Sequence, residues 1–208
     1  MIVESRNDKK VKLMKLNIAV LPGDGIGPEV IAQAVKVLKA IALEFNHIFT
    51  FQKALVGASA IDKTGNPLPE ETISICKKAD AVLFGAIGDI KYDEDPDAKI
   101  RPEQGLLGIR KELGLSTNIR PIIAYEDLLN KSSLKVKQIK DTNILIYREL
   151  TGGIYFGKRH LSKDGNTASD TCEYNRFEIE RIAHLAFKAA QSRKRKLTLV
   201  DKANVLET

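Results

Sequence analysis

The sequence predicts an α/β fold: a mostly parallel sheet flanked by helices, with a protruding β-hairpin arm. Short apolar, β-branched runs such as LNIAVL at 16–21 are typical of strands buried on both faces. Segments with apolar residues at helical spacing lie between these runs, and this alternation is typical of a parallel sheet. Late in the chain, Asp164-Gly165 lies between two extended runs, and this pattern predicts a hairpin.

The first elements form a strand, a glycine turn and a helix. The strand at 16–21 ends at Pro22-Gly23-Asp24-Gly25. Pro28 suits the first turn of a helix, and Glu29 interacts favourably with the helix dipole. The apolar stripe that we expect to pack on the sheet consists of Ile31, Ala34, Val35, Leu38, Ile41, Ala42 and Phe45.

The later elements are predicted from the same two periodicities. We expect strands at 48–56, 81–84, 116–123, 142–150 and 197–200, and helices at 69–78, 105–113 and 176–192. The polar stretch 1–14 lacks the apolar core of a secretion signal, so we expect a disordered extension there.

Composition narrows the class of protein. The 208 residues are 43% hydrophobic and 29% charged, as in ordinary globular domains, and no apolar run approaches membrane-spanning length. The net charge is +6, but only 9–15 and 193–196 form short basic clusters, so we expect no nucleic acid or membrane partner. An anionic small-molecule substrate would explain the excess positive charge as well as a nucleic acid would. Cys76 and Cys172 are far apart without CxxC spacing, which favours reduced thiols in a cytoplasmic protein.

Two motifs carry recognisable chemistry. In RELTGGIYFG at 148–157, a glycine-broken turn separates Arg148, which can bind a carboxylate, from Tyr155, which can handle a proton. The glycines of PGDGIGPE at 22–29 give G-x-G-x-G, not the G-x-G-x-x-G of a Rossmann turn. From spacing alone, this second motif is equally well explained as a tight turn without a ligand.

Four segments together resemble one family, the 3-isopropylmalate dehydrogenases. They are PGDGIGPE (22–29), IRPEQGLLGIRKELGLSTNIRP (100–121), RELTGGIYFG (148–157) and VDKANVLE (200–207). The resemblance runs from about Lys15 to the last residue. It implies NAD-dependent oxidative decarboxylation of (2R,3S)-3-isopropylmalate to 4-methyl-2-oxopentanoate in leucine biosynthesis, by a homodimer that uses Mg²⁺ or Mn²⁺.

The resemblance also implies roles for individual residues. Arg110, Arg120 and Arg148 would bind the two substrate carboxylates, whereas a single arginine is more often a surface ion-pair partner. Leu106 and Leu107 would form an apolar wall for the isopropyl group, although leucines at this spacing are by default helix core. Val205 would line the substrate pocket beside Lys202, although its default interpretation is strand packing. Tyr155 would protonate the enol, Lys202 would act as the base in the partner subunit's site, and Ile26, Glu103 and Asn204 would contact the cofactor.

Three of these residues also have a structural interpretation. Tyr155 could pack as an aromatic of the arm, Lys202 could be a solvated residue at a strand end, and Asn204 could belong to strand packing. The related dehydrogenases that act on isocitrate, homoisocitrate or tartrate are alternatives of the same class. The pair Leu106-Leu107 disfavours them, because their substrates carry polar groups in place of the isopropyl branch.

The resemblance suggests that the chain is the N-terminal part of such an enzyme. Residues 15–115 would belong to the first, cofactor-side domain and 116–208 to the substrate and dimerisation domain. In the family, the metal-binding aspartates follow the VDKANVLE strand, so we expect no metal ligand in this chain. We therefore expect the isolated chain to be inactive and poorly folded. A non-catalytic remnant with only a dimerisation role is the alternative from a different class.

Overall fold

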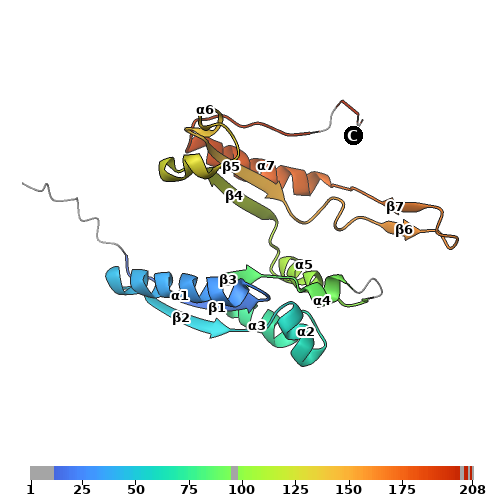
Figure 1. Cartoon of the computed structure of the whole chain (residues 1–208), viewed down its shortest axis with the longest axis horizontal. Helices are drawn as coiled ribbons and strands as arrows, with labels where there is room; N and C mark the ends of the chain where they lie inside the picture. Colours follow the sequence, from blue (N-terminus) through green and yellow to red (C-terminus); the bar gives the residue numbers. More distant parts are fainter. Residues whose placement is uncertain (1–11, 95–97, 202–203, 206, 208) are drawn as a thin grey trace, which may run out of the picture. The chain divides into compact units, whose positions relative to one another are not determined.

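A computed structural model describes residues 12–94, 98–201, 204–205 and 207. The chain divides into two compact units, Met1–Gly114 and Leu115–Thr208 (Figure 1). Of the stretch expected to be disordered, only Lys12, Leu13 and Met14 are described. The carbonyl of Met14 accepts a hydrogen bond from the amide of Ile48, at 2.9 Å.

The first unit is built on a three-stranded parallel sheet with strand order β2-β1-β3. Its strands are β1 (Lys15–Gly23), β2 (Ile48–Lys53) and β3 (Ala81–Ala86). The parallel pairing confirms the prediction for this part of the chain. β1 lies in the centre with both faces covered, which explains its unbroken apolar run. β2 ends three residues before the predicted limit of 56.

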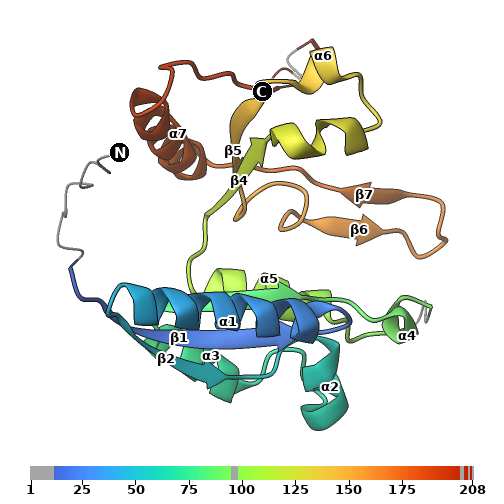
Figure 2. The same cartoon turned by 60° about the vertical axis from the view of Figure 1, so that its left-hand side comes forward.

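Alternate residues of β1 belong to two hydrophobic clusters, because successive side chains of a strand point to opposite faces. Ile18 and Val20 pack with Ile31 of helix α1 (Gly27–Glu44). Ala19 and Leu21 form the other cluster, with apolar residues of α3 (Glu70–Lys78) and α5 (Glu103–Glu112). Helices therefore cover both faces of this sheet (Figure 2).

The apolar stripe of α1 packs over only part of its length. Ile31 is buried, and Val35 and Leu38 contact the same cluster, whereas Ile41 and Phe45 are 38% and 47% exposed. The end of the predicted stripe therefore does not pack on the sheet. Phe45 stacks on the ring of His47 instead.

Two short helices of this unit were not predicted, α2 (Ala58–Thr64) and α4 (Ile90–Asp93). Both are too short to show helical periodicity. α2 begins after Gly57, whose φ of 77° favours glycine.

The second unit contains an antiparallel pair of strands, β4 (Thr117–Ile123) and β5 (Asn143–Glu149). The sequence predicts both strands but not their direction: in addition to the parallel sheet of the first unit, they form a separate antiparallel pair. Between them lie the 3₁₀ helix η1 (Glu126–Lys131) and α6 (Val136–Ile139). Helix α7 (Arg176–Gln191) contacts β5 and begins with a capping box between Asn175 and Glu178.

The predicted arm is present as a hairpin of β6 (Arg159–Leu161) and β7 (Ala168–Asp170), which extends from the rest of the second unit (Figure 2). Asp164 stabilises its turn by accepting hydrogen bonds from the Ser162 hydroxyl and the Asn166 amide and side chain. These hydrogen bonds lower the pKa of Asp164 to about 2.

The predicted strand at 197–200 does not form. The structure assigns no strand there, and Leu199 and Val200 are 87% and 91% exposed. An apolar run becomes a strand only where a neighbouring strand provides a hydrogen-bonding ladder, and no described residue pairs with this segment.

Candidate active site

The glycine turn after β1 is held against the end of β3. Gly23 has a φ of 72°, and a Cβ atom there would lie 1.9 Å from the carbonyl oxygen of Ala86. The next amide, that of Asp24, donates to the same carbonyl at 2.8 Å. Only glycine can occupy position 23 without displacing β3.

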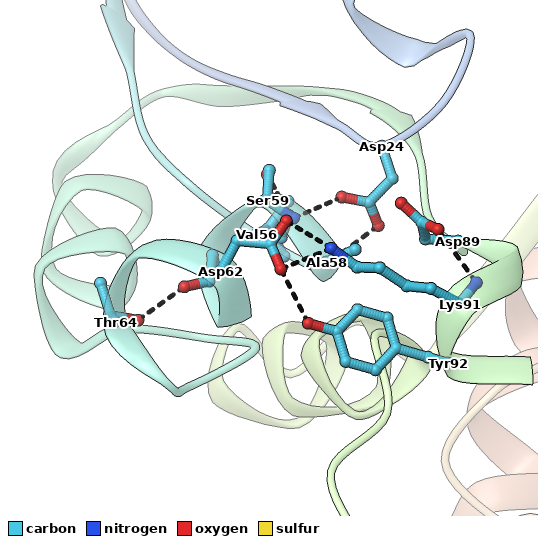
Figure 3. A network of polar contacts seen from close by, with 10 residues as sticks. Asp24, Val56, Ala58, Ser59, Asp62, Thr64, Asp89, Lys91 and Tyr92 are labelled. Atoms are coloured by element: carbon cyan, nitrogen blue, oxygen red, sulfur yellow. Dashed lines mark hydrogen bonds and ion pairs between the residues drawn. The ribbon is translucent and has the colours of Figure 1, made fainter. Parts of the chain in front are cut away.

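Asp24 connects this turn to two other loops through its buried carboxylate. Its oxygens accept hydrogen bonds from the backbone amides of Ala58 at 2.9 Å, Ser59 at 2.9 Å and Gly88 at 3.1 Å. Figure 3 shows the first two of these bonds at the start of α2. The sequence analysis did not single out Asp24. The only signal in the sequence was an acidic residue inside a glycine turn.

Two of the predicted cofactor-binding residues lie near this junction. Ile26 stands at the start of α1 and is 58% exposed, and Glu103 is the exposed first residue of α5. A Cβ atom on Gly88 would lie 3.5 Å from the Glu103 carboxylate, so this glycine is close to both Asp24 and Glu103. The junction follows the carboxyl ends of β1 and β3, where open parallel sheets bind ligands.

An exposed ionic network fixes α4 to α2. The Lys91 ammonium lies 2.6 Å from both oxygens of Asp62, and the Tyr92 hydroxyl donates to the same carboxylate at 2.9 Å (Figure 3). The hydrogen bond from Lys91 is the main cause that lowers the pKa of Asp62, and the same bond raises the pKa of Lys91. α2 is thus held at its first turn by Asp24 and further along by α4.

The predicted substrate residues of α5 lie on a partly covered face. Gly105 and Ile109 are the buried positions of this helix, whereas Leu106, Leu107 and Arg110 are half-buried. The two leucines therefore remain available for contact with a ligand.

In the second unit, Arg120 and Arg148 project from the same face of the β4–β5 pair. Arg148 is directly opposite Asn118, and Arg120 lies two residues beyond Asn118 on the same strand. The two arginines are therefore diagonal neighbours, at the spacing of about 7–8 Å typical of such pairs. The Arg120 Nε donates to the Asn118 side chain at 2.6 Å, and both arginines are exposed.

Tyr155 lies beside Arg148, one of these two arginines. The guanidinium carbon of Arg148 is 5.5 Å from the centre of the Tyr155 ring, a cation–π distance. Tyr155 is 54% exposed, so its hydroxyl is not confined to the core. One short segment therefore brings a guanidinium group and a phenol together.

The turn between Arg148 and Tyr155 is organised by Glu149, which the sequence analysis did not identify. Its carboxylate accepts hydrogen bonds from the amides of Thr151 and Gly152, both at 2.8 Å, and from the Thr151 hydroxyl. Arg181 of α7 lies 3.2 Å from the same carboxylate. Burial alone would raise the pKa of Glu149, but these hydrogen bonds together lower it below its usual value of 4.5.

The remaining predicted residues lie near the end of the chain. Lys202 is outside the described residues. Asn204 and Val205 are described and exposed, and neither belongs to a strand. Within the described ranges, no group of three or more His, Cys, Asp or Glu side chains could hold a metal ion. No helix in the described part is long and apolar enough to cross a membrane.

Comparisons with known proteins match almost the whole chain. The profile of the isocitrate/isopropylmalate dehydrogenase family covers residues 17–208. A 3-isopropylmalate dehydrogenase from Bacillus subtilis is 53% identical over 199 residues, which cover 94% of this chain and 54% of the relative. Another from Heyndrickxia coagulans is 52% identical over 197 residues, with the same shares covered.

Solved structures show the same relationship. The isocitrate dehydrogenase of Methylococcus capsulatus superimposes with a TM-score of 0.75 at 30% identity and covers 91% of this chain and 52% of that one. A β-decarboxylating dehydrogenase from Thermococcus kodakarensis gives a TM-score of 0.64 at 36% identity, with 91% and 50% covered. The chain spans about half the length of the curated relatives it matches. By sequence and by fold, the chain belongs to the isocitrate/isopropylmalate dehydrogenase family.

Proposed function

We propose that the protein containing this chain catalyses the NAD-dependent oxidative decarboxylation of (2R,3S)-3-isopropylmalate to 4-methyl-2-oxopentanoate. The supporting observation is the group formed by Arg120, Arg148 and Tyr155 on one face of the second unit. It combines two guanidinium groups, suited to a dicarboxylate, with a phenol suited to proton transfer.

The residues of this group have distinct roles in the proposed reaction. Arg120 and Arg148, together with Arg110, bind the two carboxylates and orient the 2-hydroxyl group. A bound NAD would supply the hydride acceptor for C2 of the substrate. The 3-carboxylate then leaves as carbon dioxide, and Tyr155 donates a proton to C3 of the resulting enolate, which becomes the 2-oxo acid. The proton of the 2-hydroxyl passes to Lys202, which we assign to the site of the partner subunit in a homodimer.

The cofactor would bind at the junction that follows the carboxyl ends of β1 and β3, with contacts from Ile26, Glu103 and Asn204. A Cβ atom on Gly25 would meet no atom within 4 Å, so the backbone of the glycine turn is open to a ligand. Mg²⁺ or Mn²⁺ remains a proposal based on the family. The described residues hold no acidic cluster that would fit such an ion, so no step is assigned to it.

The apolar pair on α5 favours isopropylmalate over isocitrate. Leu106 and Leu107 offer an apolar surface for the isopropyl branch, and they leave the third carboxylate of isocitrate without a polar partner. A pocket of this kind discriminates one methylene group by only about 1–3 kcal/mol, but it rejects a buried unpaired charge more strongly. Leucine biosynthesis in the cytoplasm would be the corresponding physiological role.

A chimera tests the proposal. Residues 15–208 are followed by the part of the Bacillus subtilis relative that lies beyond its match to this chain, and NADH formation is measured with 3-isopropylmalate and with isocitrate. We expect a higher kcat/KM for 3-isopropylmalate. Tyr155→Phe should lower kcat by about 100-fold or more, and Arg120→Lys should lower kcat/KM because a bidentate contact is lost.

Arg176→Gln is the matched control. It removes an arginine whose side chain is 90% exposed and whose one ionic partner among the described residues is Glu180 of the same helix, so kcat and KM should not change. Equal kcat/KM values for the two substrates would contradict the assigned specificity. Full activity of the Tyr155→Phe variant would contradict the assigned proton donor.

A further inference from the structure

We propose that Arg181 is a positioning residue that holds the turn between Arg148 and Tyr155 in place through Glu149 and Thr151. Its consequence for catalysis rests on the proposed function, whereas its effect on the turn does not. None of these three residues contacts the substrate in the proposed mechanism.

The turn is built around the Glu149 carboxylate. The amides of Thr151 and Gly152 donate to one of its oxygens, and the Thr151 hydroxyl donates to the other. Hydrogen bonds to an ionised acceptor are stronger than neutral ones. Because the three donors come from the two residues at the start of the turn, their common acceptor fixes the direction in which the chain leaves β5.

Arg181 connects this turn to α7. One of its terminal nitrogens lies 3.2 Å from Glu149 and also donates to the Thr151 hydroxyl. The side chains of Arg181 and Glu149 are only 27% and 10% exposed, and the guanidinium lies 5.1 Å from the centre of the Phe177 ring. Partial burial reduces solvent screening, so this pair differs from an ordinary exposed ion pair.

The segment before α7 encloses the same turn from a second side. A Cβ atom on Gly153 would lie 2.5 Å from the hydroxyl of Tyr174, and one on Gly152 would lie 2.7 Å from the Glu178 carboxylate. The amide of Gly153 donates to the carbonyl of Glu173 at 2.7 Å. The turn is therefore fixed at its start by Arg181 and at its glycines by residues 173–178.

This arrangement places the network and the proposed active site on opposite faces of one strand. Glu149 and Arg148 are neighbours on β5, so their side chains project from opposite faces. Glu149 is directed towards α7, and Arg148 lies against Tyr155 on the other side. A proton donor must lie within hydrogen-bond reach of its acceptor, so small displacements of the turn would slow proton transfer.

Hydrogen exchange on the folded chimera, whether or not it is active, tests the structural part. In Arg181→Gln and in Thr151→Val, the amides of Thr151 and Gly152 should exchange at least about tenfold faster, because their hydrogen bonds to Glu149 are weakened. The Arg176→Gln control on the same helix should leave both rates unchanged. Unchanged rates in Arg181→Gln and Thr151→Val would overturn the proposal.

Kinetics of the chimera test the catalytic part. Arg181→Gln should lower kcat by about 10- to 100-fold while the KM for NAD stays constant, and Arg181→Lys should restore part of the loss because a cation again faces Glu149. In a Tyr155→Phe background, Arg181→Gln should have little further effect, since Arg181 acts through Tyr155.

The two proposals can fail separately. An inactive chimera with the natural residues would count against the proposed function, and the exchange rates would still test the role of Arg181. A loss of kcat of equal size with and without Tyr155 would show that Arg181 acts elsewhere, which would overturn the positioning role.

Discussion

Replacing Asp24 by Asn tests whether one buried carboxylate holds three loops of the first unit together. Asp24 is 5% exposed, and its two oxygens accept backbone hydrogen bonds from Ala58, Ser59 and Gly88. Asparagine has nearly the same shape but offers one oxygen, and its amide group can only donate. The substitution therefore changes the hydrogen bonding with little change in packing.

The expected cost follows from these contacts. With its oxygen at the Oδ2 position, the asparagine keeps the hydrogen bonds from the amides of Ala58 and Gly88. Because its oxygen is uncharged, each of these two hydrogen bonds contributes about 1 kcal/mol less to stability. The amide of Ser59, which donates to Oδ1, then faces an NH₂ group, and leaving it unpaired costs about 1–3 kcal/mol. We expect the first unit to lose about 3–5 kcal/mol of stability in total.

Hydrogen exchange of the chimera at increasing urea concentration measures this loss at the amides of β1. The control is Asp80→Asn, because Asp80 also accepts a backbone amide, that of Asn17 at 2.8 Å, but at an exposed site. The control should cost about 1 kcal/mol or less. If Asp24→Asn destabilised the unit no more than Asp80→Asn, the assignment of Asp24 as the link between the loops would be wrong.

Three further predictions concern other positions. Gly23→Ala should destabilise the first unit much more than Gly25→Ala in urea unfolding. Both glycines have positive φ, which costs an alanine about 1–2 kcal/mol. Of the two, only Gly23 has backbone atoms in the place of the added Cβ atom. Lys91→Met should raise the pKa of Asp62 towards 3.8, measured by NMR titration. The pKa of Glu149 is lower in the folded state, so its contribution to stability is full above pH 4.5 and is lost as the pH falls through the folded-state pKa. The urea midpoint of the natural chain should therefore decrease with falling pH over this range, and the midpoint of Glu149→Gln should lack this decrease.

The sequence predicts those elements whose periodicity matches their final environment. The run at 16–21 has no polar residue except Asn17, and β1 is covered on both faces. The helix at 176–192 has both an apolar stripe and the Asn175–Glu178 capping pattern, and α7 begins and ends within one residue of the prediction. Asp164-Gly165 predicts the hairpin because local turn chemistry alone determines it.

Elements that depend on a distant partner are predicted less well. Residues 197–200 have the composition of a strand but form none, because strand formation requires a ladder that no described residue provides. The apolar runs of β4 and β5 indicate strands but not their relative direction, which is set by the connection through η1 and α6. The sequence places an acidic residue, Asp24, in a glycine turn but does not indicate its partners, which are amides 34 to 64 residues away.

In the candidate site too, a sequence motif identifies some residues, and strand pairing determines which other residues lie beside them. The motif 148–157 identifies Arg148 and Tyr155, but only the register of β4 and β5 puts Arg120 on the same face as Arg148. A slip of one residue would exchange the faces of Arg148 and Glu149 and place a carboxylate where the substrate carboxylates are proposed to bind. The bond between Glu149 and Arg181 opposes this slip, because it ties Glu149 to the side of α7. The register of β5 and the charge of the proposed site therefore depend on the same pair of residues.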